Sequence, residues 1–143
     1  MFELGGKTAL VTGATRGIGE ASARALDAAG ARVILSGRTT SDLVRVASEL
    51  KNEPIMLEAD LSPPGAGTQH AAQVLEATGG EGVNIIVNNA GIPMRRTPEA
   101  LSEEDFDLVF SINVRSLLML TIGLVEPMKR RGKGSIINIS SVA

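Results

Sequence analysis

The amino-acid sequence predicts an α/β fold in which helices cover both faces of one parallel sheet. Short β-branched runs alternate with longer helical stretches along the 143 residues, which is the pattern of successive β-α-β units. Most of these runs are almost continuously apolar, as strands are when both faces of a parallel sheet are covered. We therefore expect one doubly wound parallel sheet formed by residues 1–143.

The order of elements follows from the apolar periodicity and the turn residues. Strands are predicted at residues 8–12, 32–36, 54–59, 83–88 and 134–140. Helices are predicted between them at residues 18–29, 42–51, 67–78 and 103–129. Gly30 is a typical residue after a helix end, Thr40 or Ser41 is expected to cap the second helix, and Ser102 the last.

The composition excludes several classes of function. The net charge of −2 argues against a nucleic-acid interface, which needs a basic face. Cys is absent, so no disulfide, thiolate nucleophile or metal site is predicted. The one histidine, His70, lies in a polar run and is expected to be a solvated helix residue. We see no signal peptide and no apolar run of about 18 residues, and we expect a cytoplasmic protein without a membrane partner.

The stretch TGATRGIG, residues 12–19, lies between the first strand and the first helix. Its glycines, Gly13, Gly17 and Gly19, allow main chain to approach a ligand closely. The helix N-terminus that follows offers free N–H groups to a pyrophosphate. A tight turn alone would also use glycines, but this strand–turn–helix position favours nucleotide binding.

The end of the second strand bears on which nucleotide is bound. Folds specific for NAD place an acid about 20 residues past the glycine turn, and that position is Gly37. A carboxylate there would repel a 2′-phosphate, and its absence removes that repulsion; Arg16 and Arg38 can offer guanidinium forks to the phosphate. NADP is therefore favoured over NAD, although both arginines could be plain surface charges.

The last helix carries two further signals. Asn113 lies on the same stripe as Phe106, Phe110 and Leu117, so it is expected to be buried, as a functional residue or as a satisfied core amide. Residues 117–120 are four consecutive apolar residues that point to all sides of the helix. This predicts a helix–helix subunit interface, unless further chain covers that face.

Four segments in this order resemble the short-chain dehydrogenase/reductase family: TGATRGIG at 12–19, NNAG at 88–91, Asn113, and NISS at 138–141. The resemblance implies a Rossmann-like topology. It also implies roles for named residues. The glycine turn would bind the cofactor through Gly13, Thr15, Arg16, Gly17, Ile18 and Gly19.

Further roles follow from the same resemblance. Asn88 would brace neighbouring backbone, and Ala90 and Gly91 would let the cofactor ribose approach. Asp60 would contact adenine, although it could instead cap a turn in its own loop. Asn113 would hold an ordered water for a proton relay. Ser141 would be the catalytic serine, with Ser140 the weaker candidate.

The family pairs that serine with a downstream Tyr-x-x-x-Lys motif, and this sequence contains no Tyr. The lysines at 7, 51, 129 and 133 are expected at the opposite edge of the sheet and cannot replace it. We therefore expect the N-terminal, cofactor-binding portion of an NADP-dependent oxidoreductase that interconverts a ketone and a secondary alcohol. The sheet would be incomplete at its C-terminal side, and this portion alone would bind cofactor without turnover. The alternative is a non-catalytic nucleotide-binding module or remnant.

Overall fold

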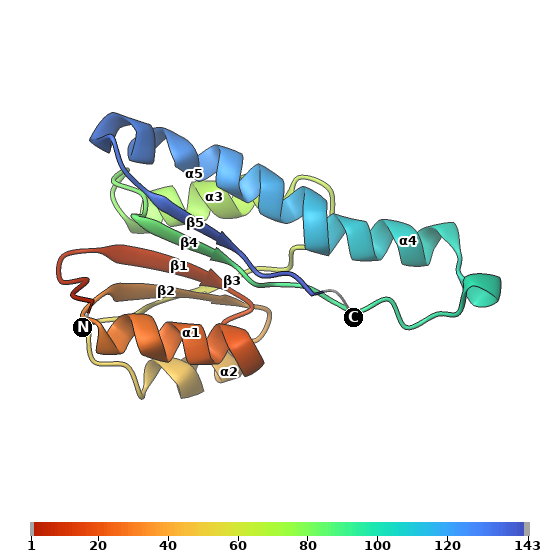
Figure 1. The fold of residues 1–143 in the computed structure, drawn as a ribbon, viewed down its shortest axis with the longest axis horizontal. Helices are drawn as coiled ribbons and strands as arrows, with labels where there is room; N and C mark the ends of the chain where they lie inside the picture. Colours follow the sequence, from red (N-terminus) through yellow and green to blue (C-terminus); the bar gives the residue numbers. More distant parts are fainter. Residues whose placement is uncertain (1, 142–143) are drawn as a thin grey trace.

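The strands lie side by side in the order β3–β2–β1–β4–β5, and every neighbouring pair is parallel. The computed structural model describes residues 2–141 (Figure 1). The strands are β1 (Thr8–Thr12), β2 (Arg32–Gly37), β3 (Ile55–Glu58), β4 (Ile85–Asn88) and β5 (Ser135–Asn138). The helices are α1 (Gly17–Ala28), α2 (Thr40–Ala47), α3 (Ala66–Ala77), η1 (Pro98–Ala100), α4 (Glu103–Phe110), η2 (Ser111–Ser116) and α5 (Leu117–Arg131).

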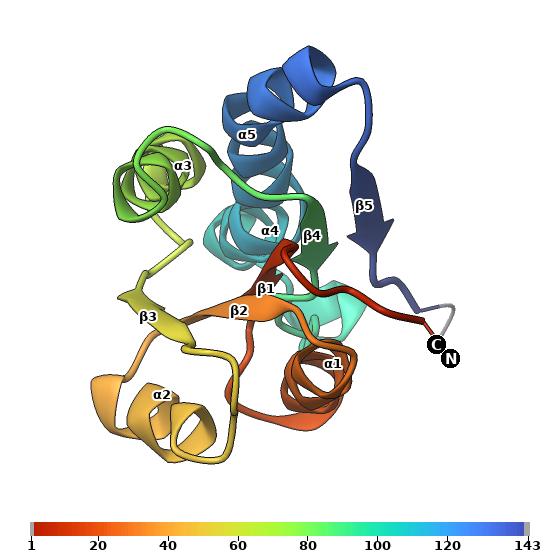
Figure 2. The same cartoon turned by 90° about the vertical axis from the view of Figure 1, so that its left-hand side faces the viewer.

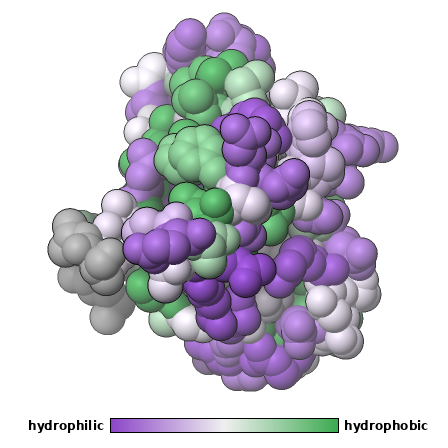
Figure 3. All heavy atoms as spheres, turned by 90° about the vertical axis from the view of Figure 1, so that its right-hand side faces the viewer, coloured by the Kyte–Doolittle hydropathy of each residue, from purple (hydrophilic) through white to green (hydrophobic). Residues whose placement is uncertain are grey.

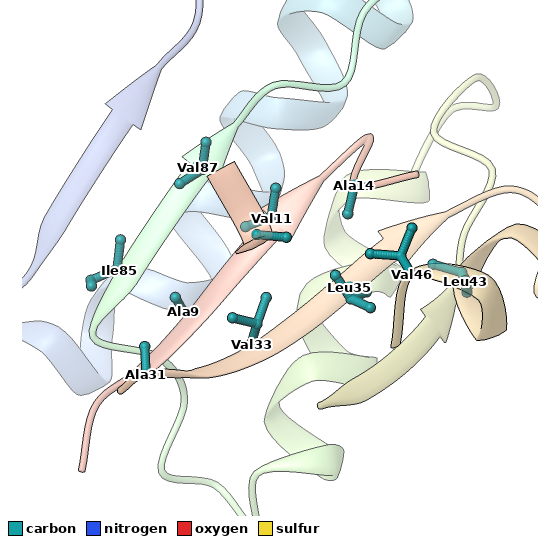
Figure 4. Close-up of a cluster of buried hydrophobic side chains, with 11 residues drawn as sticks. Ala9, Val11, Ala14, Ala31, Val33, Leu35, Leu43, Val46, Ile85 and Val87 are labelled. Atoms are coloured by element: carbon teal, nitrogen blue, oxygen red, sulfur yellow. The ribbon is translucent and has the colours of Figure 1, made fainter. Parts of the chain in front are cut away.

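Helices cover both faces of the sheet, as the sequence predicts. Figure 2 shows α1 and α2 on one face and α3 with α5 on the other. Because side chains alternate along a strand, each strand supplies both cores. Figure 4 shows the first core, in which neighbouring strands direct Ala9, Val11, Val33, Leu35, Ile85 and Val87 to one face. The residues between them, Leu10, Ile34 and Ile86, pack in the second core with Val74, Leu120 and Leu124.

Element boundaries differ from the predicted ones by a few residues, most of all at α2. This helix ends at Ala47 rather than at residue 51, and its N-cap residue is Thr39. Neither Thr40 nor Ser41 caps it, because both lie inside the helix and the Thr40 hydroxyl donates to Glu58 instead. The predicted cap of α4 is confirmed: Ser102 Oγ accepts from Asp105 N at 3.1 Å in a complete capping box.

The long last helix is confirmed, but it is not α-helical throughout. The segment η2 between α4 and α5 is a π-helix, a form that often marks a functional site. α3 packs closely on this region, since a Cβ on Gly67 would lie 2.1 Å from the Ser116 carbonyl oxygen. The Ser116 hydroxyl also donates to the Leu61 carbonyl at 2.6 Å.

The helix from Glu103 to Arg131 is long and apolar enough to cross a membrane by length and composition. The expectation that no segment reaches this threshold was therefore wrong. Its residues Leu120, Leu124 and Met128 are buried against the sheet layer. Only 28% of its most apolar 18-residue window is buried inside the protein, so covering the sheet accounts for part of the apolar composition.

The expectation of a solvated His70 was also wrong, because this side chain is 1% exposed. His70 lies in α3 on the face that carries Ala66, Gly67, Ala71 and Val74, which packs on α5. Its Nδ1 bonds Gln73 Oε1 at 2.8 Å. Burial lowers the pKa of His70, so the ring is neutral near pH 7.

An apolar surface runs along the outer side of α4, η2 and α5. We call it the outer helix face; its exposed residues are Phe106, Phe110, Val114, Leu118, Met119 and Ile122. Seen from the α4 end, apolar side chains gather in the half of the molecule that holds these helices (Figure 3). For Phe106 and Phe110, Figure 1 shows the reason, because α4 extends beyond the carboxyl edge of the sheet and has no strand beneath it.

β5 is the edge strand on this side, and all four of its residues are exposed. Ile136 and Ile137 are 42% and 45% exposed. This agrees with the predicted incomplete sheet. An uncovered edge of this kind is a template for pairing with further chain.

Candidate functional site

A cleft of about 460 Å³ opens at the carboxyl edge of the sheet. Ligands of doubly wound sheets bind at this edge, where the strand order reverses. Here the reversal falls between β1 and β4. Most lining residues lie at or just beyond the ends of four strands: Gly13, Thr15, Arg16, Gly17 and Ile18 after β1; Ser36 and Gly37 at the end of β2, with Arg38, Thr39 and Asp42 beyond it; Ala59, Asp60 and Leu61 after β3; and Asn89, Ala90, Gly91 and Ile92 after β4. Ile112 of η2 completes the lining.

The three glycines of the turn meet three different constraints. Gly13 and Gly17 have φ values of 61° and 54°, which favour glycine. A Cβ on Gly19 would lie 2.0 Å from the Gly13 carbonyl oxygen, so no side chain fits there. A Cβ on Gly17 would meet nothing within 4 Å. The first and third glycines thus close the turn, while Gly17 keeps the cleft open.

Two residues that our sequence analysis did not select, Thr12 and Asn89, hold this turn in place. Thr12 Oγ1 donates to the Val87 carbonyl at 3.3 Å and accepts from the backbone N–H groups of Asn89 and Ala90, both at 3.0 Å. Asn89 Nδ2 donates to the Thr12 and Gly13 carbonyls, both at 3.1 Å. The signal available in the sequence was a hydroxyl at the buried end of the first strand.

We had expected the Asn88 side chain to brace neighbouring backbone, but its hydrogen bonds go to other side chains. Its Nδ2 donates to Thr121 Oγ1 at 3.0 Å and to Asn138 Oδ1 at 2.9 Å, while its own Oδ1 is buried without a partner among the described residues. The reason is strand alternation: Asn88 points to the α5 side and Asn89 to the glycine turn. Asn88 therefore ties β4 to β5 and α5.

Two cations and two carboxylates border the cleft. Arg16 and Arg38 are exposed, and among residues 2–141 neither guanidinium group makes a hydrogen bond or an ion pair. Asp60 caps a turn, because its Oδ1 accepts from Ser62 N at 2.9 Å and Ser62 Oγ at 2.7 Å. These bonds, and more weakly the charge of Arg38, lower the pKa of Asp60. The turn-cap reading is thus met, and the adenine contact stays a prediction.

Asn113 is exposed in η2, so the expectation of a buried amide was wrong. Phe106 and Phe110 of the same stripe are exposed as well, whereas Leu117 is buried. Its side chain is nevertheless fixed: Oδ1 accepts from Ile92 N and Nδ2 donates to Ile92 O, both at 2.8 Å. Asn113 therefore fastens the segment after β4, which lines the cleft, to the π-helical turn.

Ser140 and Ser141 follow β5 and are exposed. β4 and β5 are parallel neighbours with Asn88 opposite Asn138, so the serines leave the sheet at the edge that holds the cleft. The lysines lie elsewhere, as expected. Lys7 and Lys51 border a separate hollow with Gly30 and Arg32 at the amino edge.

These features define a Rossmann-like sheet with an open cleft at its switch point, and known proteins share this fold. A family model described as "short chain dehydrogenase" matches residues 7–143. The chain belongs to the short-chain dehydrogenase/reductase family of oxidoreductases.

Among curated proteins, Nodulation protein G of Rhizobium sp. (strain N33) is 45% identical over 142 residues, which are 99% of this chain and 57% of that protein. The 2-dehydro-3-deoxy-D-gluconate 5-dehydrogenase of Bacillus subtilis (strain 168) is 40% identical over 144 residues, 99% of this chain and 55% of that protein. The chain thus spans just over half the length of these relatives.

Solved structures show the same fold. A 3-oxoacyl (acyl-carrier-protein) reductase from Agrobacterium tumefaciens C58 with NADP bound has a TM-score of 0.89 and 35% identity, covering 99% of this chain and 55% of that one. L-sorbose reductase from Gluconobacter frateurii, complexed with NADPH and L-sorbose, has a TM-score of 0.89 and 30% identity. The match covers 99% of this chain and 54% of that one.

Proposed function

We propose that this chain is the cofactor-binding portion of an NADP-dependent oxidoreductase that transfers hydride between nicotinamide and a ketone or secondary alcohol. One observation carries the choice of cofactor: β2 ends in Gly37 without a carboxylate, and Arg16 and Arg38 both line the same cleft. Neither guanidinium has a protein partner among the described residues, so both are available for a 2′-phosphate. The reductase of Agrobacterium tumefaciens with bound NADP supports the proposal as a similar protein.

The residues present fit such a cofactor. The N-terminus of α1 and the turn at Gly17 offer N–H groups and open space to the pyrophosphate. Asp60 keeps one carboxylate oxygen outside its turn bonds with Ser62 and could accept from adenine. Ala90 and Gly91 present little side chain to the ribose.

The bound nicotinamide would supply or accept the hydride. Ser141, by its family resemblance, would donate a hydrogen bond to the substrate oxygen, and Asn113 would orient a water in the proton relay. The proton itself needs a donor within hydrogen-bond reach of that oxygen. Since the 143 residues hold no Tyr, we propose that this portion alone binds cofactor without turnover, and that the Tyr and Lys of the family act from further chain.

The first test is a fluorescence titration of NADPH and NADH with the protein at its native length. We expect NADPH to bind at least about tenfold more tightly, as one charge-assisted contact of about 1.5–3 kcal/mol allows. Gly17→Val should weaken NADPH binding, because it fills open space in the cleft. Equal binding of both nucleotides would contradict the NADP assignment.

A carbonyl reduction assay separates this proposal from the alternative of a non-catalytic module. The alternative rests on the absence of Tyr. It predicts NADPH binding without turnover at any length of chain. Turnover that is lost in Ser141→Ala with NADPH affinity kept within about threefold would exclude it.

We also propose a cytoplasmic homo-oligomer formed through the outer helix face. Of residues 117–120, Leu117 and Leu120 are buried, while Leu118 and Met119 are exposed, at 55% and 39%. Exposed apolar area of this kind marks interaction surfaces. Sedimentation of the native-length protein should show an oligomer that Leu118→Glu dissociates, and a monomeric wild type would contradict this part.

A further inference from the structure

Gly37, the last residue of β2, has no side chain, and the structure leaves no room for one. Gly37 is buried, and a Cβ at this position would lie 2.9 Å from Thr15 Cγ2 and 3.2 Å from Leu43 Cδ2. Real side chains do not approach below about 3 Å without a shift of the neighbour, because interiors are closely packed. Thr15 comes from the glycine turn and Leu43 from α2, so two elements wall this position.

Neither wall yields easily. Leu43 is 1% exposed and packs in the first core. Thr15 is β-branched, so its side chain is restricted at χ1. Its backbone is also held, since its carbonyl accepts from Arg45 Nη2 at 2.6 Å, and Arg45 is in turn paired with Glu20 at 3.1 Å.

We infer that Thr15 is a specificity-determining residue: its methyl group excludes an acid at position 37 and so keeps the ribose end of the cleft for a phosphate-bearing nucleotide. This rests on the proposed function. The nucleotide preference is thus set by steric exclusion at residue 15 together with the charge of Arg38. An acidic side chain at position 37 cannot reach a ribose hydroxyl unless Thr15 is replaced by a smaller residue.

The test is a double-mutant cycle of Gly37→Asp and Thr15→Ala, in the native-length protein, with NADH and NADPH as the probes. Gly37→Asp alone should bind NADPH at least about tenfold more weakly than the wild type, without binding NADH more tightly. Thr15→Ala combined with Gly37→Asp should bind NADH at least about tenfold more tightly than Gly37→Asp alone. Gly5→Asp is the matched control, because it adds the same charge at a glycine with nothing within 4 Å and away from the cleft.

A second cycle covers the case in which Gly37→Asp does not fold. Gly37→Ala should lower the midpoint of thermal unfolding, and the loss should be smaller when Thr15 is Ala. Equal losses in both backgrounds, or tight NADH binding by Gly37→Asp alone, would overturn the inference while wild-type NADPH binding stands. A wild type that binds neither nucleotide would overturn the proposed function and this inference together.

Discussion

Replacing Gly19 by Ala tests whether the glycine turn is closed by contact or only by conformation. The added Cβ would lie 2.0 Å from the Gly13 carbonyl oxygen and 2.5 Å from Asn89 Nδ2. Relieving this overlap costs about 1–3 kcal/mol. Moving the Asn89 amide would also break its bonds to the Thr12 and Gly13 carbonyls, at about 1 kcal/mol each. Helix propensity returns about 1 kcal/mol, since Ala is the better helix former.

The net expectation for Gly19→Ala is a loss of about 2–4 kcal/mol in the free energy of unfolding, measured by urea denaturation followed by circular dichroism. Propensity alone would give a gain of about 1 kcal/mol, so the sign decides between the two accounts. Gly5→Ala is the control, because its Cβ would meet nothing within 4 Å; it should stay within about 0.5 kcal/mol of wild type. A Gly19→Ala variant as stable as this control would refute the contact argument.

Three further outcomes are expected. Arg38→Asp should weaken NADPH binding by about tenfold or more and move the preference toward NADH, whereas Arg95→Asp, outside the cleft lining, should not. Asn113→Ala removes both 2.8 Å bonds to Ile92, so trypsin should cut the loop between β4 and α4 several-fold faster; unchanged cleavage would contradict the fastening role. The pKa of Glu20 is lowered to about 2 by its arginine partners from an ordinary 4.5. The stabilisation from ionised Glu20 is therefore complete at pH values above 4.5 and is lost as the pH falls toward 2. The urea midpoint of the wild type should fall over this pH range, and Glu20→Gln should make that fall smaller.

The parallel sheet and its order of elements followed from the sequence because one physical pattern recurs in each unit. Leu10 and Val11 point to opposite faces of β1 and are both fully buried, so the strand reads as a continuous apolar run. The cleft followed from the same reasoning, since the residues after each parallel strand must meet at one edge. Boundaries did not follow, because strand ends depend on hydrogen bonds to neighbours that local sequence does not reveal.

The errors at His70 and Asn113 share one cause, which is that burial depends on what lies next to a helix. His70 was read as solvated from its polar neighbours, yet α3 turns that face to α5. Asn113 was read as buried from its apolar neighbours, yet two of them, Phe106 and Phe110, are themselves exposed. Asn88 and Asn89 could not be told apart by composition, because only strand alternation decides which amide faces the glycine turn.

The proposed cofactor-binding cleft and the proposed catalytic serine differ in how well the strands that carry them are buried. Most of the cleft lies at the ends of β1, β2 and β4, whose apolar residues, such as Val11, Leu35 and Ile86, are almost wholly buried. The serines follow β5, whose residues are all exposed. Substitutions at the glycine turn or at Arg38 can therefore be read by nucleotide binding alone, in a rigid frame. The effect of a Ser141 substitution can be measured only in a protein whose further chain covers β5. NADPH affinity is therefore the measurement that tests the cleft independently of turnover.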